Sequence, residues 1–530
     1  MYQIPNDLLF RLIDRHGPTI IQQGKRGVEK ESLRVDALSG ALSQTPHPTA
    51  LGAALTHPFI TTDYAESLLE FVTPAVPTNE EAIRFLYDLH RYTYRHIPGE
   101  TLWPCSMPCG FSRHSDVPLA RYGDSNVGRM KTIYRRGLGH RYGRIMQTIS
   151  GVHFNYSLPK PVWDALCPLV GSDICSSQTS QNFQSAGYFA LIRNFRRLSW
   201  LILYLFGSSP AVCKSFFQGA ETGLADFPGN TAAGEYATSL RMSDIGYNNH
   251  AQASLNISVN SLDEYVAGLT RAISTPYPDY EQRGLFDGDK RIQLSTNILQ
   301  IANEYYSVVR PKRVAKSGEE PTAALRRRGV EYVEIRALDL DPFSAVGVNQ
   351  IELDFVECLL LHCVFTSSPA ISASEQVDIA NNDNAVAAYG RKPGLELCRD
   401  GRNIALSDWA SQVCDQLVTL ARILDEGSAD NRYAKAVRHQ QAVIEDVRMA
   451  PSARVLEALS KGSLTYNEFG LARAQMVAKE FEEAEFTHPE TAENLAELAR
   501  ESLAKAEEVR AADTLSFDDY LADYFTRGLM

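Results

Sequence analysis

The chain has 530 residues, of which 44% are hydrophobic and 22% are charged, and this composition excludes an intrinsically disordered protein. Its 52 basic and 64 acidic side chains give a formal net charge of −12, which argues against nonspecific binding to nucleic acid or to an anionic membrane. The length predicts roughly two to four structural units.

The N-terminal residues 1–18 have the pattern of a short amphipathic helix and lack the apolar stretch of a signal peptide. The longest uncharged apolar run, at 198–208, is too short to span a bilayer. Nine cysteines occur without any CxxC pair, so we expect no zinc site and reduced, mostly buried thiols. These features predict a soluble, cytoplasmic protein that binds neither nucleic acid nor membrane.

Strand-like and helical segments follow one another without the regular alternation of a doubly wound sheet, which predicts an α+β fold. The predicted strands cover 26–35, 66–73, 150–157, 253–259 and 330–338. The predicted helices cover 78–97, 184–206, 260–273, 350–366, 407–425 and 432–448. We therefore expect a sheet-based core over residues 1–345 and a mostly helical layer packed on it over residues 346–530.

The predicted strand at 26–35 places Glu29 and Glu31 on the same face, because side chains alternate along a strand. Adjacent carboxylates on a partly buried face repel each other unless cations neutralise them, and Mg²⁺ prefers carboxylate oxygens. A solvated strand face with interleaved charges is the alternative, and this segment taken alone favours it.

Two interpretations of segment 60–74 remain open. Asp63 and Glu70 are seven residues apart, so they could share one face of a helix. The β-branched end before Pro74 is equally compatible with a strand over 68–73. In that strand Glu70 is either paired on a buried face or exposed at a sheet edge.

The predicted strand at 150–157 has one apolar face, while Gly151, His153 and Asn155 lie on the other. A structural histidine and a ligand histidine are equally compatible with this pattern. Gly151 beside His153 would permit the close approach of a ligand.

The predicted strand at 330–338 places Glu334 and Arg336 on one face. They form either a same-face salt bridge or a functional pair, in which Glu334 binds a metal and Arg336 binds a carboxylate or phosphate. Arg241 is a further candidate for binding an anion.

A basic segment precedes this strand and contains Arg310, Lys312 and Arg313. It is the concentrated positive charge that an acidic protein needs in order to bind a nucleotide, although a solvated basic loop has the same composition. No GxxxxGK[ST] phosphate-binding loop occurs in the chain.

Taken together, these segments predict a sheet with one face on the core and the other lining a polyanion site with several divalent cations. Such a site suits phosphoryl transfer, where positioning and charge neutralisation supply most of the catalysis. A metal-dependent phosphohydrolase and a noncatalytic binding protein are the alternatives from charge alone.

Seven sequence blocks occur in an order that resembles the bacterial glutamate–cysteine ligase (γ-glutamylcysteine synthetase) family of the gammaproteobacterial type. They are RGVEKESLRV, ALTHPFITTDYAESLLEFVTP, LWPCSMPC, RYGRIMQTISGVHFNYSLP, YATSLRMSDIGY, LQIANEYYSVVRPKR and GVEYVEIRALDLDPFS. The likeness runs from about residue 20 to residue 350 and is weaker in the last third.

The resemblance implies a glutamine-synthetase-like fold, in which a curved antiparallel sheet forms a funnel-shaped site, helices pack on its outer face and the C-terminal part is largely helical. It implies that ATP phosphorylates the γ-carboxylate of glutamate and that the amine of cysteine then displaces phosphate, giving γ-glutamylcysteine for glutathione biosynthesis. The implied cofactor is Mg²⁺ or Mn²⁺, with ATP as co-substrate. Glutathione is an implied feedback inhibitor, and a related ligase with another acceptor amine is the alternative.

The resemblance also implies roles for individual residues. The implied metal ligands are Glu29, Glu31, Asp63, Glu70, His153 and Glu334. The implied catalytic residues are Arg336, Arg241 and Glu334. The implied amine-substrate pocket contains Tyr134, Leu138, Gln147, Tyr247 and Tyr306. Nucleotide binding is predicted, from the charge of the basic segment rather than from the resemblance, at Arg310, Lys312 and Arg313. Ala302 stands where the family leads us to expect an acid, which leaves Glu304 as the local carboxylate.

Overall fold

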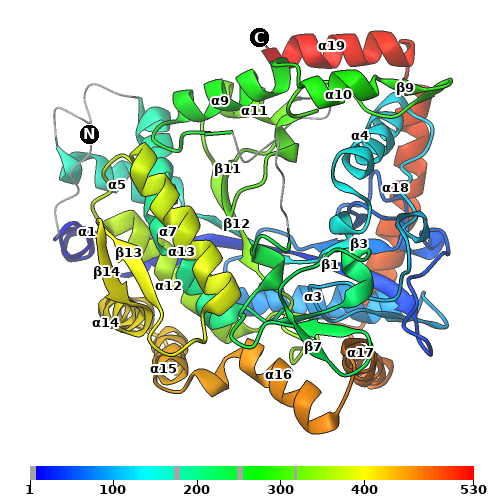
Figure 1. Ribbon diagram of the computed structural model, residues 1–530. Coiled ribbons are helices and arrows are strands. Elements are labelled where there is room, and N and C mark those ends of the chain that lie inside the picture. The colour runs from blue at the N-terminus through cyan, green and yellow to red at the C-terminus, as the bar shows by residue number, and fades with distance from the viewer. Residues whose placement is uncertain (1–6, 172–178, 247–254, 316–318, 530) are drawn as a thin grey trace.

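The structure is a computed structural model, and it describes residues 7–171, 179–246, 255–315 and 319–529. Within these ranges its centre is a seven-stranded antiparallel sheet in the order β11-β12-β5-β1-β3-β2, with β4 paired to the last residues of β1 (Figure 1). The strands of this sheet are β1 (Lys25–Asp36), β2 (Ile60–Thr62), β3 (Leu68–Val72), β4 (Glu100–Leu102), β5 (Val152–Ser157), β11 (Val309–Lys312) and β12 (Tyr332–Leu338). The predicted α+β class is confirmed, as are the strands predicted at β1, β3, β5 and β12.

The other described strands form small antiparallel sheets. They are β6 (Ala211–Cys213), β7 (Ala225–Phe227), β8 (Thr231–Ala233), β9 (Phe286–Asp287), β10 (Lys290–Arg291), β13 (Glu396–Arg399) and β14 (Arg402–Ala405). The helices up to residue 345 are α1 (Leu8–His16), α2 (Thr19–Gln22), α3 (Asn79–Tyr94), α4 (Asn126–Tyr142), α5 (Lys160–Val170), α7 (Ser180–Phe206), α9 (Leu262–Ser274), α10 (Pro278–Arg283) and α11 (Pro321–Arg328). Those beyond it are α12 (Gln350–Phe365), α13 (Ala373–Tyr389), α14 (Leu406–Leu424), α15 (Arg432–Glu445), α16 (Pro451–Gly462), α17 (Tyr466–Glu483), α18 (Thr491–Ala511) and α19 (Phe517–Leu529).

The six predicted helices are confirmed at α3, α7, α9, α12, α14 and α15, and the N-terminal amphipathic helix is confirmed at α1. The strand predicted at 253–259 is wrong for residues 255–259; residues 253–254 lie outside the described ranges. Ile257 and Val259 are buried in the main core, which gives the segment its alternation. No strand pairs with residues 255–259 in the part of the chain that the structure describes. The alternation of apolar and polar residues in this segment therefore reflects burial and not a strand.

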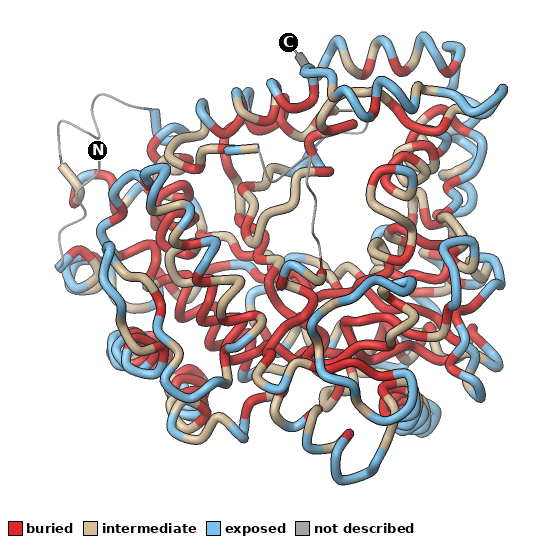
Figure 2. The backbone as a smooth tube through the Cα atoms, viewed as in Figure 1, coloured by how far each residue is buried: buried red, intermediate tan, exposed pale blue. Residues whose placement is uncertain are grey.

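One face of the sheet rests on the main hydrophobic core. Val28, Phe154 and Ile335 belong to this core together with buried residues of α7 and α12. Figure 2 shows the central strands and the helices behind them as largely buried. Because this face is apolar, the side chains that alternate with it are directed to the opposite face, where the candidate site lies.

A buried polar network joins β1 to the helices that follow residue 345. On the core side of the sheet, Arg26 Nε donates to Glu357 Oε2 of α12 at 2.9 Å. Tyr433 of α15 donates to the same oxygen at 3.0 Å, and Asn79 of α3 donates to Asp354 of α12 at 2.8 Å. These contacts attach α12 and α15 to the sheet, while the domain boundary between residues 345 and 346 stays a prediction.

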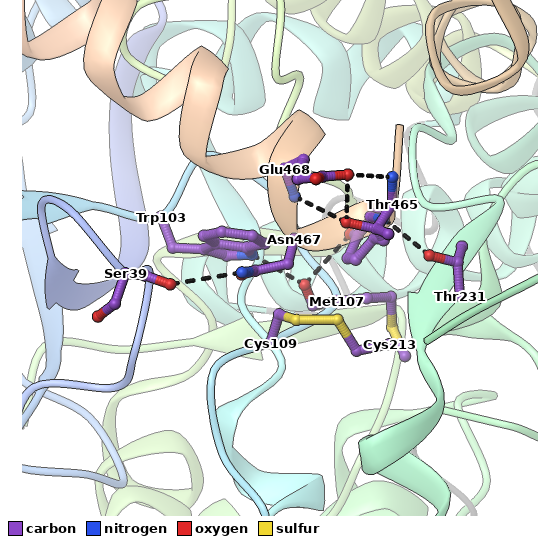
Figure 3. Close-up of a disulfide and its surroundings, with 10 residues drawn as sticks. Ser39, Trp103, Met107, Cys109, Cys213, Thr231, Thr465, Asn467 and Glu468 are labelled. Atoms are coloured by element: carbon purple, nitrogen blue, oxygen red, sulfur yellow. Dashed lines mark hydrogen bonds between the residues drawn. A yellow bond between two sulfur atoms is a disulfide. The ribbon is translucent and has the colours of Figure 1, made fainter. Parts of the chain in front are cut away.

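The prediction of reduced cysteines is wrong for Cys109, Cys213 and Cys167, which are disulfide-bonded. Cys109 and Cys213 form a disulfide, with their Cα atoms 5.6 Å apart although 104 positions separate them in sequence. Figure 3 shows this bond beside Trp103 and the start of α17, where Trp103 Nε1 donates to Met107 O at 3.0 Å. Sequence spacing carries no information on which distant cysteines the fold brings together. Five other cysteines are free, and all of them except Cys398 are buried.

The second face of the sheet is bordered by α4, α11 and α19. α19 contacts both α4 and α11 (Figure 1). None of the helices in the described ranges has both the length and the apolar character needed to cross a membrane.

Candidate active site

A cavity of about 470 Å³ lies over the polar face of the sheet. The register of the strands brings its acidic residues together: Glu29 lies opposite His153 of β5, and Glu31 lies opposite Glu70 of β3. Glu334 of β12 is one strand further on, opposite Asn155. Side chains directly opposite in an antiparallel pair are neighbours, so residues as far apart in sequence as Glu29 and Glu334 share one small volume.

His153 stands at the centre of two acidic groups. Its Nδ1 lies 3.0 Å from Glu29 Oε2 and 3.8 Å from Glu334 Oε1. Its Nε2 lies 3.7 Å from Glu31 Oε1. The donor atoms of Glu29, His153 and Glu334 are within 4.8 Å of one another, and so are those of Glu31, Glu70 and His153. The imidazole can therefore contribute to either of two cation sites.

Burial makes the carboxylates of this face differ in their tendency to ionise. Burial raises the pKa of Glu70 well above its usual range, and the nearby Asp63 and Glu29 raise it further. Burial also raises the pKa of Glu31. For Glu334 burial acts in the same direction, but Lys312 and Arg336 outweigh it and hold the pKa well below its ordinary value. Glu334 therefore keeps its negative charge, whereas Glu31 and Glu70 bind protons more readily, and a divalent cation would favour their ionised forms.

The residues present fit a hard divalent cation. The side chain of Glu334 is only 1% exposed, yet its Oε2 atom has no hydrogen-bond partner among the described residues. An orphaned buried carboxylate oxygen costs free energy unless a ligand satisfies it. Carboxylates with one imidazole form a donor set suited to Mg²⁺ or Mn²⁺.

Cationic side chains lie beside the acids. Arg336 Nη1 is 3.2 Å from Glu334 Oε1, and Lys312 Nζ is 3.3 Å from the same oxygen. Arg310 also lines the cavity, and its guanidinium donates to the carbonyl of Asn303 at 3.0 Å. Arg310, Lys312 and Arg336 therefore present positive charge next to the acidic cluster.

Arg241 is held just behind this group, at the short helical turn Leu240–Met242. Its Nη2 donates to the carbonyl of Arg336 at 2.8 Å, and its Nη1 lies 3.5 Å from Asp339 Oδ1. Asp339 is fixed in turn by Ser208 N, which donates to it at 2.9 Å. A Cβ atom at Gly151 would collide with the Arg241 guanidinium, so the glycine provides the space that this side chain occupies.

The helix α4 forms a second wall of the cavity. Tyr134 and Leu138 face the cavity from α4, and Gln147 faces it from the helical turn Met146–Thr148. Tyr306 completes this group and donates to Met242 Sδ at 2.9 Å. Four of the five residues predicted for the amine pocket are thus close to the acidic cluster; Tyr247 lies outside the described residues.

The remaining predicted residues are placed differently. Asp63 lines the cavity and lies 3.7 Å from Arg135, with 42% of its side chain exposed. Glu304 also lines the cavity and pairs with Arg141 at 3.0 Å. Arg313 does not line the cavity and instead lies 3.7 Å from Glu331.

Several cavity residues were not predicted. They are Lys131 and Arg135 of α4 and Tyr520 and Tyr524 of α19. Asn155, predicted on the polar face of its strand but not as a site residue, contacts Glu29. The spacing of three and four residues along 127–138 carries a signal for α4. No local signal places α19 here, because its position depends on tertiary packing.

Comparison with known proteins supplies the family. A sequence model described as glutamate-cysteine ligase matches residues 9–386. A glutamate–cysteine ligase from Alcanivorax borkumensis is 48% identical over 94% of this chain and 95% of that one, and one from Azotobacter vinelandii is 45% identical over 96% and 95%. A crystal structure of glutamate–cysteine ligase from Francisella tularensis in complex with AMP superposes with a TM-score of 0.89 at 36% identity, covering 96% of this chain and 99% of that chain.

An acidic cluster and adjacent cations over an antiparallel sheet define a class of enzyme that handles polyanionic substrates. Within that class, the chain belongs to the glutamate–cysteine ligase family.

Proposed function

We propose that the cavity over the sheet joins the γ-carboxyl group of glutamate to the amine of cysteine in an ATP-dependent reaction, the first step of glutathione biosynthesis. One observation carries this proposal: two groups of residues whose geometry could hold a metal ion share His153, within a cavity that Arg336 and Lys312 also line. The carboxylate of glutamate and the phosphates of ATP are all anionic, so the reaction needs bound cations and cationic side chains that neutralise their charges.

The metal site consists of Glu29, Glu31, Asp63, Glu70, His153 and Glu334. A divalent cation, Mg²⁺ or Mn²⁺, supplies neutralisation of phosphate and carboxylate oxygens when bound there. The protein orients this donor set from outside: Asn155 donates to Glu29 Oε1 at 2.9 Å, and the Gly151 N–H donates to Glu31 Oε2 at 2.8 Å. These second contacts fix the carboxylates before a substrate arrives.

In the reaction, a γ-carboxylate oxygen of glutamate attacks the terminal phosphorus of ATP and ADP leaves. The cysteine nitrogen then attacks the carbonyl carbon of the acyl phosphate, the carbon–oxygen bond to phosphate breaks, and the nitrogen releases a proton as the amide forms. Arg336 stabilises the negative charge that develops on the transferred group, because its planar guanidinium can donate two parallel hydrogen bonds. Arg241 reinforces this function and holds the backbone of Arg336 in place. Glu334 keeps Arg336 and Lys312 oriented.

The phosphates of ATP bind along β11 at Arg310 and Lys312. Arg313 has no part in this proposal, since it lies outside the cavity and beside Glu331. Cysteine binds near Tyr134, Leu138, Gln147 and Tyr306, with Tyr247 as a further contact. Glutathione contains the γ-glutamylcysteine unit, so the parts of the cavity that hold glutamate and cysteine would accept it as a feedback inhibitor. A cytoplasmic location remains part of this proposal.

The testing experiment measures ADP release by the purified protein with ATP, Mg²⁺ and glutamate, with and without cysteine, and determines the product mass. We expect cysteine-dependent ADP release and the mass of γ-glutamylcysteine. Replacing cysteine with 2-aminobutyrate then tests whether the thiol is required. ADP release that no amine changes, with no ligated product, would contradict the proposal and indicate a phosphohydrolase.

A further inference from the structure

A second cavity, of about 690 Å³, lies among the helices α7, α12, α13 and α14 and the hairpin β13–β14 (Figure 1). None of the described residues that line it also lines the active-site cavity. Its volume lies within the range of about 300 to 1,000 Å³ that is usual for small-molecule sites. This second cavity is therefore a candidate ligand site that the ligation reaction does not use.

Polar contacts fix the walls of the second cavity. Asn382 of α13 binds both backbone groups of Cys398 in β13: its Nδ2 donates to the carbonyl at 2.7 Å, and the Cys398 N–H donates to its Oδ1 at 2.9 Å. Asn194 of α7 donates to the carbonyls of Cys363 and Thr366, at the C-terminal end of α12, at 3.0 Å and 2.9 Å. Both asparagines are buried, and these contacts hold the elements in place without a ligand. The cavity is therefore preformed.

One part of the lining is apolar and aromatic. Leu198 of α7, Ile379 of α13 and Val413 of α14 line the cavity together with Trp409. Trp409 is buried and packs against Trp200, with the ring centroids 4.6 Å apart. A flat apolar group that leaves water for this surface gains free energy in proportion to the area it buries.

The charged groups of the lining leave one carboxylate without a basic partner. Glu375 accepts a hydrogen bond from Arg197 Nε at 2.5 Å, and Asp400 lies 4.0 Å from Arg399. Asp378, the remaining acid of the lining, has no basic nitrogen within 4.0 Å among the described residues. A positively charged group inside the cavity would therefore find its partner in Asp378.

The other titratable groups of the lining are neutral. Burial lowers the pKa of the His362 imidazole to about 4, so this side chain carries no charge near pH 7. Partial burial and the charge of Asp378 raise the pKa of the Cys398 thiol, which therefore keeps its proton. The unbalanced charge of the lining is thus negative and lies at Asp378.

We propose that the second cavity binds a small aromatic amine, with its ring against Leu198, Ile379 and Val413 and its ammonium group at Asp378. An ammonium group donates charge-assisted hydrogen bonds to a carboxylate, while the ring uses the apolar part of the lining. A neutral ring of the same size would use the apolar part alone, and an aromatic carboxylate would bring a like charge to Asp378. This assignment does not depend on the proposed ligation, because the lining residues of the two cavities differ.

Calorimetry with three compounds that share an indole ring and differ in charge tests the assignment. Tryptamine carries an ammonium group, indole is neutral and indole-3-acetate carries a carboxylate. With Mg²⁺ in excess, the full chain should bind tryptamine about tenfold more tightly than indole, and indole-3-acetate more weakly than indole. Equal affinities for the three compounds would overturn the ligand class. Absence of tryptamine binding at about 1 mM would overturn the site itself.

The Asp378→Asn variant keeps the shape of the side chain and removes its charge. Its affinity for tryptamine should fall about tenfold, whereas its affinity for indole should stay the same. Asp415→Asn is the matched control, because it removes an equal charge from α14 outside the cavity, where Asp415 accepts a hydrogen bond from Gln441. Equal tryptamine affinities of Asp378→Asn and the unchanged protein would overturn the proposal.

Crystals soaked with 5-bromotryptamine provide a second measurement that needs no variant. The bromine atom scatters anomalously and marks the position of the ring. We expect an anomalous peak beside Leu198, Ile379 and Val413, with the amine directed to Asp378. A bromine peak only in the active-site cavity, or no peak at all, would overturn the proposal even if Asp378→Asn does not fold.

Discussion

At the scale of single residues, the cavity joins acids and bases that would be unfavourable apart. Glu334 is almost fully buried, and it remains ionised because Lys312 and Arg336 lie beside it. Removing one charged side chain from this buried group leaves the opposite charges without a partner. Single substitutions here should therefore change activity much more than conservative substitutions outside the cavity.

Replacing Glu334 with Gln should lower ligation by about 100-fold or more. The amide keeps the shape of the side chain but loses the charge that a cation requires, and even changes to the partners of metal ligands cost about 10- to 100-fold. ADP release measures the effect, and circular dichroism checks the fold. Glu331→Gln is the matched control, because Glu331 pairs with Arg313 outside the cavity. Near-normal turnover of a folded Glu334→Gln enzyme would remove Glu334 from the metal site.

Replacing Arg336 with Lys should lower kcat by about 10²- to 10³-fold, the usual effect of losing one donor to a developing charge. Lysine keeps the positive charge but cannot reproduce two parallel hydrogen bonds. Arg313→Lys, outside the cavity, is the control and should be nearly neutral. Steady-state kinetics for all three substrates separate kcat from KM. An unchanged kcat would show that Arg336 has a structural role only.

The acidic residues of the site could be predicted from the sequence because a strand's period of two assigns each side chain to a face. Glu29, Glu31, His153 and Glu334 all share the predicted polar face. Segment 60–74 left a helix and a strand open, and the structure decides for the strand β3, with Glu70 opposite Glu31. The local sequence pattern could not decide between helix and strand, because the strand that pairs with β3 is about 40 residues away in the sequence.

At the scale of the elements, Gly151, directly before β5, leaves the space that the Arg241 side chain occupies. Replacing Gly151 with Ala should reduce kcat by about tenfold or more, because the new methyl group displaces the Arg241 guanidinium. The melting temperature should fall as well, because the displaced guanidinium leaves the buried Asp339 without this ion pair. Gly27→Ala on β1 is the control, as its Cβ would meet no heavy atom closer than 3.8 Å. Equal kcat values for the two variants would contradict the proposed role of Gly151.

The network between β1, α3 and α12 predicts a pH effect on stability. Burial raises the pKa of Asp354 to about 6, against a partly opposing hydrogen bond from Asn79. Because the folded-state pKa lies above the unfolded value, the contribution of Asp354 to stability is fully present below pH 4 and is lost as the pH rises through 6. Asp354→Asn should remove this loss, which is on the order of 2–3 kcal/mol.

Melting temperatures of both proteins from pH 4 to pH 8 check this prediction. The Asn variant should gain stability relative to the unchanged protein as the pH rises. A difference between the two proteins that does not vary with pH would show that Asp354 titrates normally.

At the scale of the whole molecule, the cavity is assembled from distant parts of the chain. Glu29, His153, Glu334 and Tyr520 all line it. Local patterns predict the strands β1, β3, β5 and β12 and the helices α1, α3, α7, α9, α12, α14 and α15, whereas β2, β4, β11 and the other described helices were not predicted individually. Family resemblance supplies much of the site. The contribution of α19 could not be predicted, because apolar residues at 517 and 521 show that a helix has a buried face but not which partner covers it. The disulfide between Cys109 and Cys213 escaped prediction for the same reason.

The central claim is that the acidic face of the sheet holds the divalent cations for ATP-dependent ligation. The most direct measurement is anomalous X-ray diffraction from crystals grown with Mn²⁺ and a nonhydrolysable ATP analogue. We predict anomalous peaks among Glu29, His153 and Glu334 and among Glu31, Glu70 and His153, with the phosphates beside Lys312. A bound analogue whose phosphates lie elsewhere, with no anomalous peak on this face, would contradict the account.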